Sequence, residues 1–223
     1  GENAAHARVL RLKNGDAVTV CDGEGEEWHC VVSDVTPGQV SLVVQEHTAA
    51  KSEAAVFCSV YMAFAKADKF EHVIQKATEL GAAELVAFPS ARCVSRPDEK
   101  AAAKKRERWQ KIAREAAMQA GRGKVPQVAP VTGFREAVRA FSAFPVAAVC
   151  YEGGGEPLSS LVQPSLSSAA LFIGPEGGIA PEEIDALREA GGRTVTLGPR
   201  ILRTETAPLA ALCVILSATG NME

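Results

Sequence analysis

The sequence predicts a mixed α/β protein, with a small β domain followed by a larger domain built on a parallel sheet. Near the start, short apolar strands alternate with turn dipeptides. From Val56 onward, apolar strands alternate with amphipathic helices, as in a parallel α/β layer. Two late segments, 169–178 and 194–208, each pass from a strand through a Gly-Pro loop into a helix. We therefore expect domains at residues 1–50 and 51–223, with both loops at the carboxyl edge of the sheet, where such sheets bind ligands.

The composition is that of an ordinary globular protein. The 223 residues are 47% hydrophobic and 23% charged, which suits one sizeable domain or two unequal ones. No apolar run approaches the roughly 20 residues of a membrane helix, so no membrane contact is expected. The N-terminal residues contain no apolar signal-peptide core, which predicts a cytoplasmic protein.

The cysteines and histidines do not predict a metal site. The six cysteines are scattered without a C-x-x-C pair and mostly lie in apolar runs, which indicates buried free thiols rather than a zinc site or a disulfide framework. All four histidines lie in the first third of the chain. The Gly-Pro loops therefore have no histidine base nearby in the sequence, although a distant one could fold in.

The N-terminal domain is predicted from its turns. Asn14-Gly15, Asp22-Gly23 and Pro37-Gly38 separate the apolar runs AVTVC, WHCVVSDV and VSLVVQE. This spacing predicts a small β-barrel or sandwich. Residues 47–55 are weakly patterned and make a plausible linker.

The second domain begins with a strand, a helix and another strand. Residues 56–64 form the first strand and 84–89 the next. Between them, Asp68 and Glu71 resemble a capping box at a helix start, and Gly81 fits the position after a helix end. The apolar side chains of this helix share one face, formed by Phe70, Val73, Ile74, Ala77 and Leu80.

A basic helix follows Asp98. Its apolar positions recur at helical spacing and leave the basic side chains mainly on the other side. Residues 92–124 carry 11 basic and 4 acidic side chains, whereas residues 1–56 carry 4 basic and 9 acidic ones. The basic stretch therefore predicts contact with an anionic partner, while the acidic β domain is poorly suited to hold a polyanion by charge alone.

The remaining elements complete the α/β pattern. We expect a short strand near Val128, a helix over 134–141 and a strand over 146–152. The glycines at 153–155 are followed by Glu156-Pro157 and lack GK[ST], so they do not form a phosphate loop.

The two Gly-Pro loops carry the side chains that could bind or react. Glu176 within GPEGG would repel a phosphate but suits a cationic or hydrogen-donating ligand, although it could equally cap the following helix. Arg200 and Arg203 bracket the second loop, and Thr204, Glu205 and Thr206 add donors and acceptors. Either threonine could cap the last helix, and Glu205 could simply pair with an arginine.

At this point the chain resembles a known family. FIGPEGGIAPEEI followed by LGPRILRTETAPLAAL closely resembles the bacterial 16S ribosomal RNA uracil-N3 methyltransferases, which belong to the SPOUT class of S-adenosylmethionine-dependent enzymes. Further similar segments cover most of the chain: HARVLRLKNGD, KADKFEHVIQKATELGA, PSARCVSR and RWQKIAREAAMQAGRGKVP.

The resemblance implies a fold and a set of partners. It implies a PUA-like β-barrel, a SPOUT domain with a deep trefoil knot, a homodimer, and 16S ribosomal RNA of the small subunit as substrate. It also implies that S-adenosylmethionine is held by Gly174, Gly178, Leu197, Gly198, Ile201, Leu202, Arg203 and Thr206, to which we add Glu176 for its charge.

Catalytic and RNA-binding roles follow as hypotheses. We expect Arg203 to stabilise the negative charge that develops on the uracil, and Glu205 to accept the N3 proton, through water if necessary. Because N3 is on the pairing edge, the base must be unpaired or flipped out. The charge pattern and the family motif together predict RNA contacts by Arg92, Arg96, Arg114, Gln119, Arg122 and Lys124.

Two other functions are compatible with the sequence. Another SPOUT methyltransferase could modify a ribose 2′-oxygen or a different base, because the cofactor loops say little about the acceptor. A ribosome-assembly factor that binds ribosomal RNA could retain a vestigial cofactor site. Binding of S-adenosylmethionine would distinguish the assembly factor from the two enzymes.

Overall fold

The computed structural model describes residues 11–66, 68–94 and 96–223. The chain divides into two compact units, each described separately below. The first comprises Gly1–Glu53 with Gly121–Val125, and the second comprises Ala54–Ala120 with Pro126–Glu223. The short segment 121–125 thus belongs to the first unit, although it falls inside the range predicted for the second domain.

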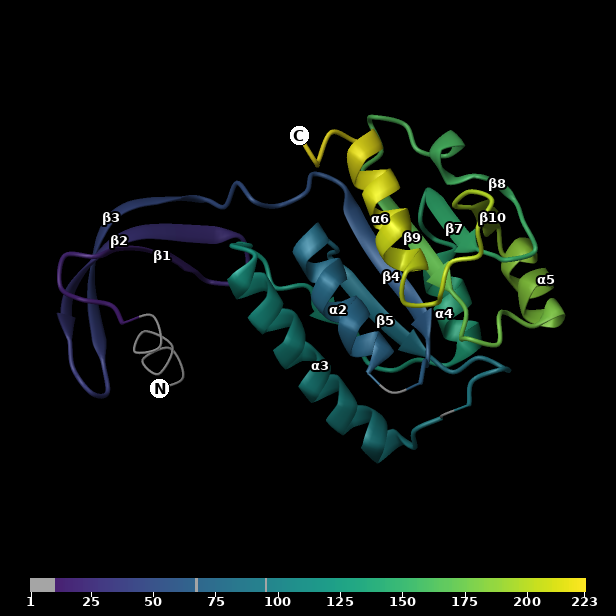
Figure 1. The fold of residues 1–223 in the computed structure, drawn as a ribbon, viewed down its shortest axis with the longest axis horizontal. Helices are drawn as coiled ribbons and strands as arrows, with labels where there is room; N and C mark the ends of the chain where they lie inside the picture. Colours follow the sequence, from purple (N-terminus) through teal and green to yellow (C-terminus); the bar gives the residue numbers. More distant parts are fainter. Residues whose placement is uncertain (1–10, 67, 95) are drawn as a thin grey trace. The chain divides into compact units, whose positions relative to one another are not determined.

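The first unit contains an antiparallel sheet of three strands, β1 (Ala17–Cys21), β2 (Glu26–Val35) and β3 (Val40–Ala49), in the order β1-β2-β3 (Figure 1). The turn between β1 and β2 is held by Asp22, whose Oδ1 accepts backbone N–H groups of Glu24 at 2.7 Å and of Gly25 and Glu26 at 3.1 Å. The predicted strands and turns are confirmed here. Closure into a barrel stays a prediction, and the family match at His6 lies outside the described residues.

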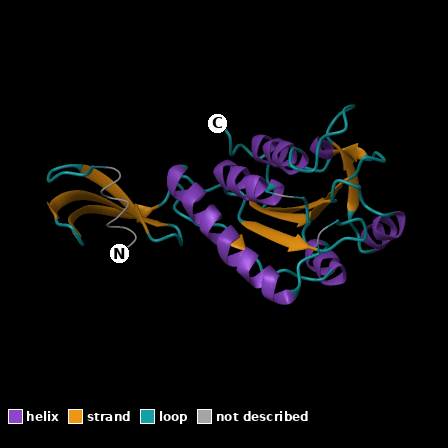
Figure 2. Ribbon diagram, turned by 60° about the horizontal axis from the view of Figure 1, so that its bottom comes forward, coloured by secondary structure: helices purple, strands orange, loops and turns teal. Residues whose placement is uncertain are grey.

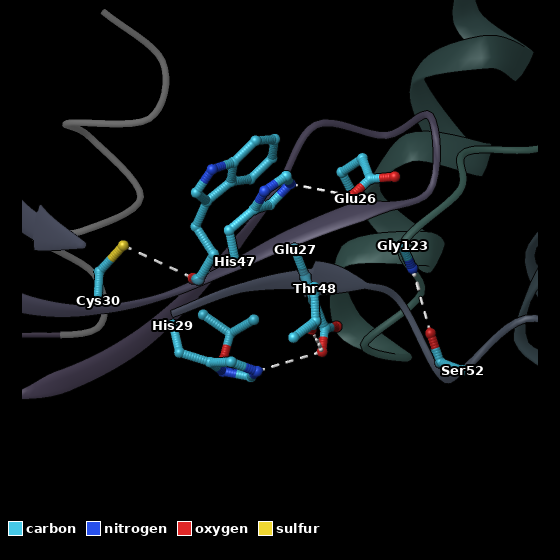
Figure 3. Close-up of polar contacts among 10 residues, drawn as sticks. Glu26, Glu27, His29, Cys30, His47, Thr48, Ser52 and Gly123 are labelled. Carbon is cyan, nitrogen blue, oxygen red and sulfur yellow. Dashed lines mark hydrogen bonds and ion pairs between the residues drawn. The ribbon is translucent and has the colours of Figure 1, made fainter. Parts of the chain in front are cut away.

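The segment 121–125 is bonded to this unit along its length. Val125 donates its backbone N–H to Gly23 O at 2.9 Å, and Gly123 donates to Ser52 Oγ at 3.2 Å (Figure 3). Arg122 Nη2 lies 2.7 Å from Glu53 Oε2. A Cβ at Gly123 would overlap the Cβ of Ala50, so only glycine fits there.

The second unit is built on a seven-stranded sheet in the order β6-β5-β4-β9-β7-β10-β8. Every neighbouring pair is parallel, as the alternation of strands and helices predicts. The strands are β4 (Phe57–Ala63), β5 (Glu84–Phe88), β6 (Gln127–Val128), β7 (Val146–Cys150), β8 (Glu156–Pro157), β9 (Ser168–Ile173) and β10 (Arg193–Thr196).

Helices cover both faces of this sheet (Figure 2). One buried cluster contains side chains of α2 (Lys69–Leu80), α3 (Glu99–Gln119) and α6 (Ala207–Ala218), with a short 3₁₀ turn at Leu158–Ser160. The other contains side chains of α4 (Phe134–Phe141) and α5 (Pro181–Glu189). In β9, Leu171 packs in the first cluster and Phe172 in the second, as the alternating geometry of a strand buried on both faces requires.

The helix ends confirm most of the local signals. Asp98 caps α3 by accepting the Ala101 N–H at 2.8 Å, and Gly81 ends α2 with a φ of 112°. The predicted capping box at Asp68 is wrong, because this side chain makes no cap hydrogen bond. Glu71 instead pairs with Arg108 of α3 at 2.6 Å, so the pattern reflects a contact between two helices.

The cysteines are in the state that the sequence predicts. All six cysteines are free, and Cys30 and Cys58 are buried while the other four are partly buried. Within the described ranges, no three His, Cys, Asp or Glu side chains lie together as a metal site would need. No helix in that part of the chain is long and apolar enough to cross a membrane.

Candidate functional site

A cavity of about 630 Å³ lies in the second unit, where the strands β7, β9 and β10 end. Its walls come from the last residues of these strands, from the loops that follow them, and from the first residues of α2 and α6. This is the carboxyl edge of a parallel sheet, the place where α/β sheets bind ligands. Its volume is in the range of sites that enclose a small organic molecule.

Most of the predicted cofactor residues line this cavity. They are Gly174, Glu176, Gly178, Leu197, Gly198, Ile201, Leu202 and Arg203. Thr206 is outside the lining that the described residues form, and its backbone N–H bonds to Arg203 O at 2.9 Å. Thr206 therefore shapes the turn that carries Arg203.

The two Gly-Pro loops contact each other directly. Thr204 Oγ1 donates to Gly174 O at 2.6 Å, so this threonine joins the loops rather than capping α6. Thr206 occupies the cap position of α6 without a side-chain cap hydrogen bond. A Cβ at Gly174 would lie 2.6 Å from Ile179 Cγ1 and 3.2 Å from Ile179 N, so the close approach of the first loop to itself requires glycine.

A lysine joins the acidic side chains of the two loops. Lys69 Nζ lies 3.3 Å from Glu176 Oε1 and 3.1 Å from Glu205 Oε2. Its contact with Glu205, followed by that with Glu176, raises the pKa of Lys69 despite some opposing desolvation. The ammonium group is therefore charged at neutral pH.

Glu176 contacts the start of α2 rather than capping α5. Its Oε1 accepts the backbone N–H of Lys66 at 2.8 Å. Burial acts to raise the pKa of Glu176, but backbone N–H groups and Lys69 outweigh it and the net pKa is lowered. At the start of α5, Ala180 donates its N–H to Glu183 Oε2 at 3.2 Å, so another carboxylate serves that helix.

Glu205 is outside the cavity lining that the described residues form. Its Oε1 is 4.0 Å from Arg203 Nη1, and the Arg203 side chain is 82% exposed at the cavity. Burial acts to raise the pKa of Glu205, but its own backbone N–H, Lys69 and Arg203 lower it overall. Glu205 is therefore ionised at neutral pH and is a weak base.

Cys150 also lines the cavity. Burial raises the pKa of its thiol to about 12. The thiol is protonated at neutral pH and contributes a small apolar surface rather than a nucleophile.

The predicted RNA-binding residues have different surroundings. Arg92 Nη1 donates to Gly177 O at 3.0 Å, and Arg96 Nη2 donates to Ser90 O and Ala91 O, both at 2.9 Å. The exposed residues of the set are Arg92, Arg96, Arg114, Gln119 and Lys124.

Arg122 differs from the rest of the predicted RNA-binding set. Its side chain is only 5% exposed and is paired with Glu53 inside the first unit. Because a buried guanidinium cannot meet a phosphate without breaking this pair, we correct its role to a structural one.

Sequence reasoning missed Lys69, Tyr151 and Glu152, which also line the cavity. Lys69 arrives there because β4 pairs with β9, with Met62 opposite Ile173, so the residues after both strands meet at one edge. That pairing joins segments more than a hundred residues apart, and no local pattern marks it. The sequence offered one indication of a role for Lys69, a charged residue shortly after the predicted strand at 56–64.

Comparisons with known proteins agree with this geometry. A family model described as an RNA methyltransferase domain matches residues 52–216, and one described as an RNA methyltransferase PUA domain matches residues 1–45. The chain is 41% identical to the ribosomal RNA small subunit methyltransferase E of Bacillus subtilis, over 96% of this chain and 87% of the relative.

Two solved structures have a similar fold. One is the ribosomal RNA small subunit methyltransferase E of Neisseria gonorrhoeae bound to S-adenosylmethionine, with a TM-score of 0.87, 31% identity, and coverage of 97% of this chain and 89% of that one. The other is a putative methyltransferase of Legionella pneumophila in complex with the same cofactor, with a TM-score of 0.87, 29% identity and the same coverage.

Proposed function

The chain belongs to the RNA methyltransferase family, and we propose that it transfers a methyl group from S-adenosylmethionine to N3 of a uridine in small-subunit (16S) ribosomal RNA. The observation that carries this proposal is the cavity that both Gly-Pro loops line at the sheet edge, with Arg203 exposed on it. The relatives with named functions act on small-subunit ribosomal RNA, which supports the substrate class.

The residues of the cavity fit S-adenosylmethionine. The volume of about 630 Å³ suits a nucleoside cofactor, and Gly174 leaves room for the backbone of the first loop to turn closely beside it. The carboxylate of Glu176 is paired with Lys69, and Glu152 adds a second carboxylate to the lining, which suits a cationic ligand better than a phosphate. When bound, this cofactor supplies an activated methyl group on a sulfonium.

Two side chains have separate roles in the methyl transfer. The uracil must lose its N3 proton, and negative charge develops on its two carbonyl oxygens. Arg203 places a permanent cation at the cavity to stabilise that charge. Because Glu205 has a lowered pKa, we assign it the weaker role of accepting the proton through water.

The product of the reaction tests this proposal. Small ribosomal subunits that lack the modification are incubated with the protein and S-adenosylmethionine, and the RNA is digested and analysed by mass spectrometry. The expected product is 3-methyluridine, formed on assembled subunits and much less on naked RNA. A 2′-O-methylated nucleoside would overturn the acceptor while keeping the enzyme class. A folded protein that did not bind the cofactor would favour an assembly factor.

We propose that RNA is held by the exposed part of the basic set, Arg92, Arg96, Arg114, Gln119 and Lys124. Arg92 and Arg96 each use part of the guanidinium on backbone carbonyls, and the five N–H donors of an arginine leave others for phosphate. The basic residues of this set attract the backbone of any RNA, so they set affinity more than sequence preference.

Replacing Arg114 by alanine is expected to weaken RNA binding uniformly across sequences. It should also reduce the slope of log affinity against log salt by about one, because one phosphate contact and its released counterion are lost. Titration of labelled ribosomal RNA at several salt concentrations measures both. Arg135→Ala, on the exposed surface of α4, is the matched control and should leave the slope unchanged. Equal effects of the two changes would argue against a localised RNA surface.

Replacing Gly174 by alanine is expected to weaken cofactor binding by about 10- to 100-fold, because the new Cβ lies 2.6 Å from Ile179 Cγ1 and forces the first loop to move. Isothermal titration calorimetry with S-adenosylmethionine measures the loss. Gly38→Ala is the matched control, because a Cβ there meets nothing within 4 Å, and it should leave cofactor affinity unchanged. Unchanged affinity in Gly174→Ala would mean that this loop does not hold the cofactor.

We also propose that the protein is a homodimer with a knotted second domain, as the family resemblance implies. Ile201 is 82% exposed, and α6 carries partly exposed apolar side chains at Leu209, Cys213 and Val214. Apolar surface of this kind favours burial against another chain. Sedimentation equilibrium tests the dimer, and a monomer at micromolar concentration would contradict it.

A further inference from the structure

We propose that Lys69 is a positioning residue for the methyl transfer: it holds one carboxylate from each Gly-Pro loop and keeps Glu205 from neutralising Arg203. This inference rests on the proposed function, because Arg203 is assigned there as the group that faces the uracil. It gives a role to a side chain that neither loop contains.

The geometry places Lys69 between the loops. It is the first residue of α2, and its Nζ lies 3.3 Å from Glu176 Oε1 and 3.1 Å from Glu205 Oε2. Glu176 follows β9 and Glu205 follows β10, and these strands are not neighbours in the sheet. The lysine therefore bridges two loops whose strands are separated by β7.

Glu205 depends on this contact. Its Oε2 is buried, and the ammonium of Lys69 at 3.1 Å is the group that compensates its charge. A buried carboxylate oxygen that loses its counter-charge is costly. Without Lys69, the cation nearest to Glu205 would be Arg203, now at 4.0 Å.

The contact between Lys69 and Glu205 affects Arg203, which lies close to the same carboxylate. The three charges alternate, with Lys69 on one side of Glu205 and Arg203 on the other. Because Lys69 attracts Glu205, the carboxylate stays at the outer limit of an ion pair with Arg203 and leaves most of the guanidinium to the cavity. Loss of Lys69 would draw Glu205 onto Arg203 and cancel the charge that the uracil needs.

The groups that face Glu205 define its pH dependence. They are Lys69 from α2 and Arg203 from its own loop, and Lys69 is shared with Glu176 of the first loop. Lys69 and Arg203 lower the pKa of Glu205, against burial that acts to raise it. Removing Lys69 should therefore raise that pKa, and the acid side of the pH–rate profile should move to higher pH.

Substitutions of Lys69 test the proposal. Lys69→Met should lower kcat by about 10- to 100-fold with little change in KM for RNA, because Arg203 is misplaced rather than the RNA surface. Lys69→Arg should restore most of the rate by restoring the charge. Lys66→Met is the matched control, since it removes a charge from an exposed side chain whose backbone N–H alone bonds to Glu176. Wild-type kcat in Lys69→Met would overturn the proposal.

A double variant tests whether Lys69 acts through Glu205. If Lys69 acts through Glu205, adding Lys69→Met to Glu205→Gln should cost much less than in the wild-type background, since the buried charge is already gone. Full additivity of the two losses would overturn the proposal. The four proteins are compared at temperatures where thermal unfolding shows each of them to be folded.

The titration of Glu205 gives a readout that does not need turnover. The ¹³C signal of its carboxyl group, assigned with Glu205→Gln, should titrate at higher pH in Lys69→Met than in wild type and near the wild-type pH in Lys69→Arg. An unshifted titration would overturn the proposal. Absence of methyl transfer by the wild-type protein on any RNA would instead refute the proposed function and, with it, the role in transfer; the titration would still show whether Lys69 controls Glu205, so the two failures are distinguishable.

Discussion

Replacing Arg203 by alanine is expected to lower kcat for methyl transfer by about 10²- to 10³-fold, the usual loss when one group that stabilises developing negative charge is removed. The side chain is 82% exposed and contacts Glu205 only at 4.0 Å, so its removal leaves no buried group unpaired in the core. Stability and RNA affinity should therefore change little. Single-turnover transfer from labelled cofactor to small subunits, with RNA binding measured separately, checks both parts.

Arg200 provides the comparison for this result. It lies on the same loop and also lines the cavity, and Arg200→Ala removes the same charge three residues away. We expect Arg200→Ala to lower kcat by less than about tenfold. Arg200 is assigned no contact with the uracil, and the interaction between two charges weakens as their separation grows. Arg203→Lys should recover only part of the rate, because an ammonium lacks the fork of a guanidinium. Equal losses at both arginines, or near-normal turnover in Arg203→Ala, would refute the assignment.

The architecture of the second unit was largely predictable from local patterns. Alternation of strands and helices after Val56 indicated a parallel sheet, and the apolar run before the first Gly-Pro loop indicated the strand that the structure shows as β9. The order of strands was not predictable. The pairing of β4 with β9 joins residues such as Met62 and Ile173, and nothing in either segment specifies the partner.

Because strand order could not be predicted, some residues of the site were identified from the sequence and others were missed. The loops that carry Gly174 and Arg203 were predicted to meet because each directly follows a strand, and parallel strands bring such loops to one edge. The cofactor role of the two residues came from the family resemblance. Lys69 reaches that edge only through the β4–β9 pairing. The Asp68–Glu71 spacing resembled a capping box, but the Glu71 carboxylate forms an ion pair with Arg108 of α3 instead.

The charge pattern had a different limitation. A count of basic residues treats Arg114 and Arg122 alike, although the structure exposes the first and buries the second. Burial depended on Glu53, which is distant in sequence and looked like part of a linker. A basic run therefore indicates an anionic partner for the group of residues, while the role of each member depends on tertiary contacts.

Replacing Arg122 by alanine is expected to destabilise the first unit by about 3 kcal/mol, the lower end of the cost of breaking a buried ion pair. The Arg122 side chain is 5% exposed and that of Glu53 is 15% exposed, so the carboxylate would stay buried without its cation. The N–H of Lys124 would still donate to Glu53 Oε1 at 3.0 Å, which limits the loss. Hydrogen exchange of the β2 and β3 amides should accelerate by about 100-fold where exchange requires opening of the unit.

Lys124→Ala separates this effect from the loss of a charge. Lys124 is in the same segment, but its side chain is exposed and its backbone N–H is kept in the variant, so stability should stay within about 0.5 kcal/mol of wild type. The two variants should also differ in RNA binding. At temperatures where both are folded, Lys124→Ala should reduce the salt dependence of affinity, and Arg122→Ala should not. If Arg122→Ala kept full stability and lost RNA affinity, the buried pair would be a minor contact and the arginine would belong to the RNA surface after all.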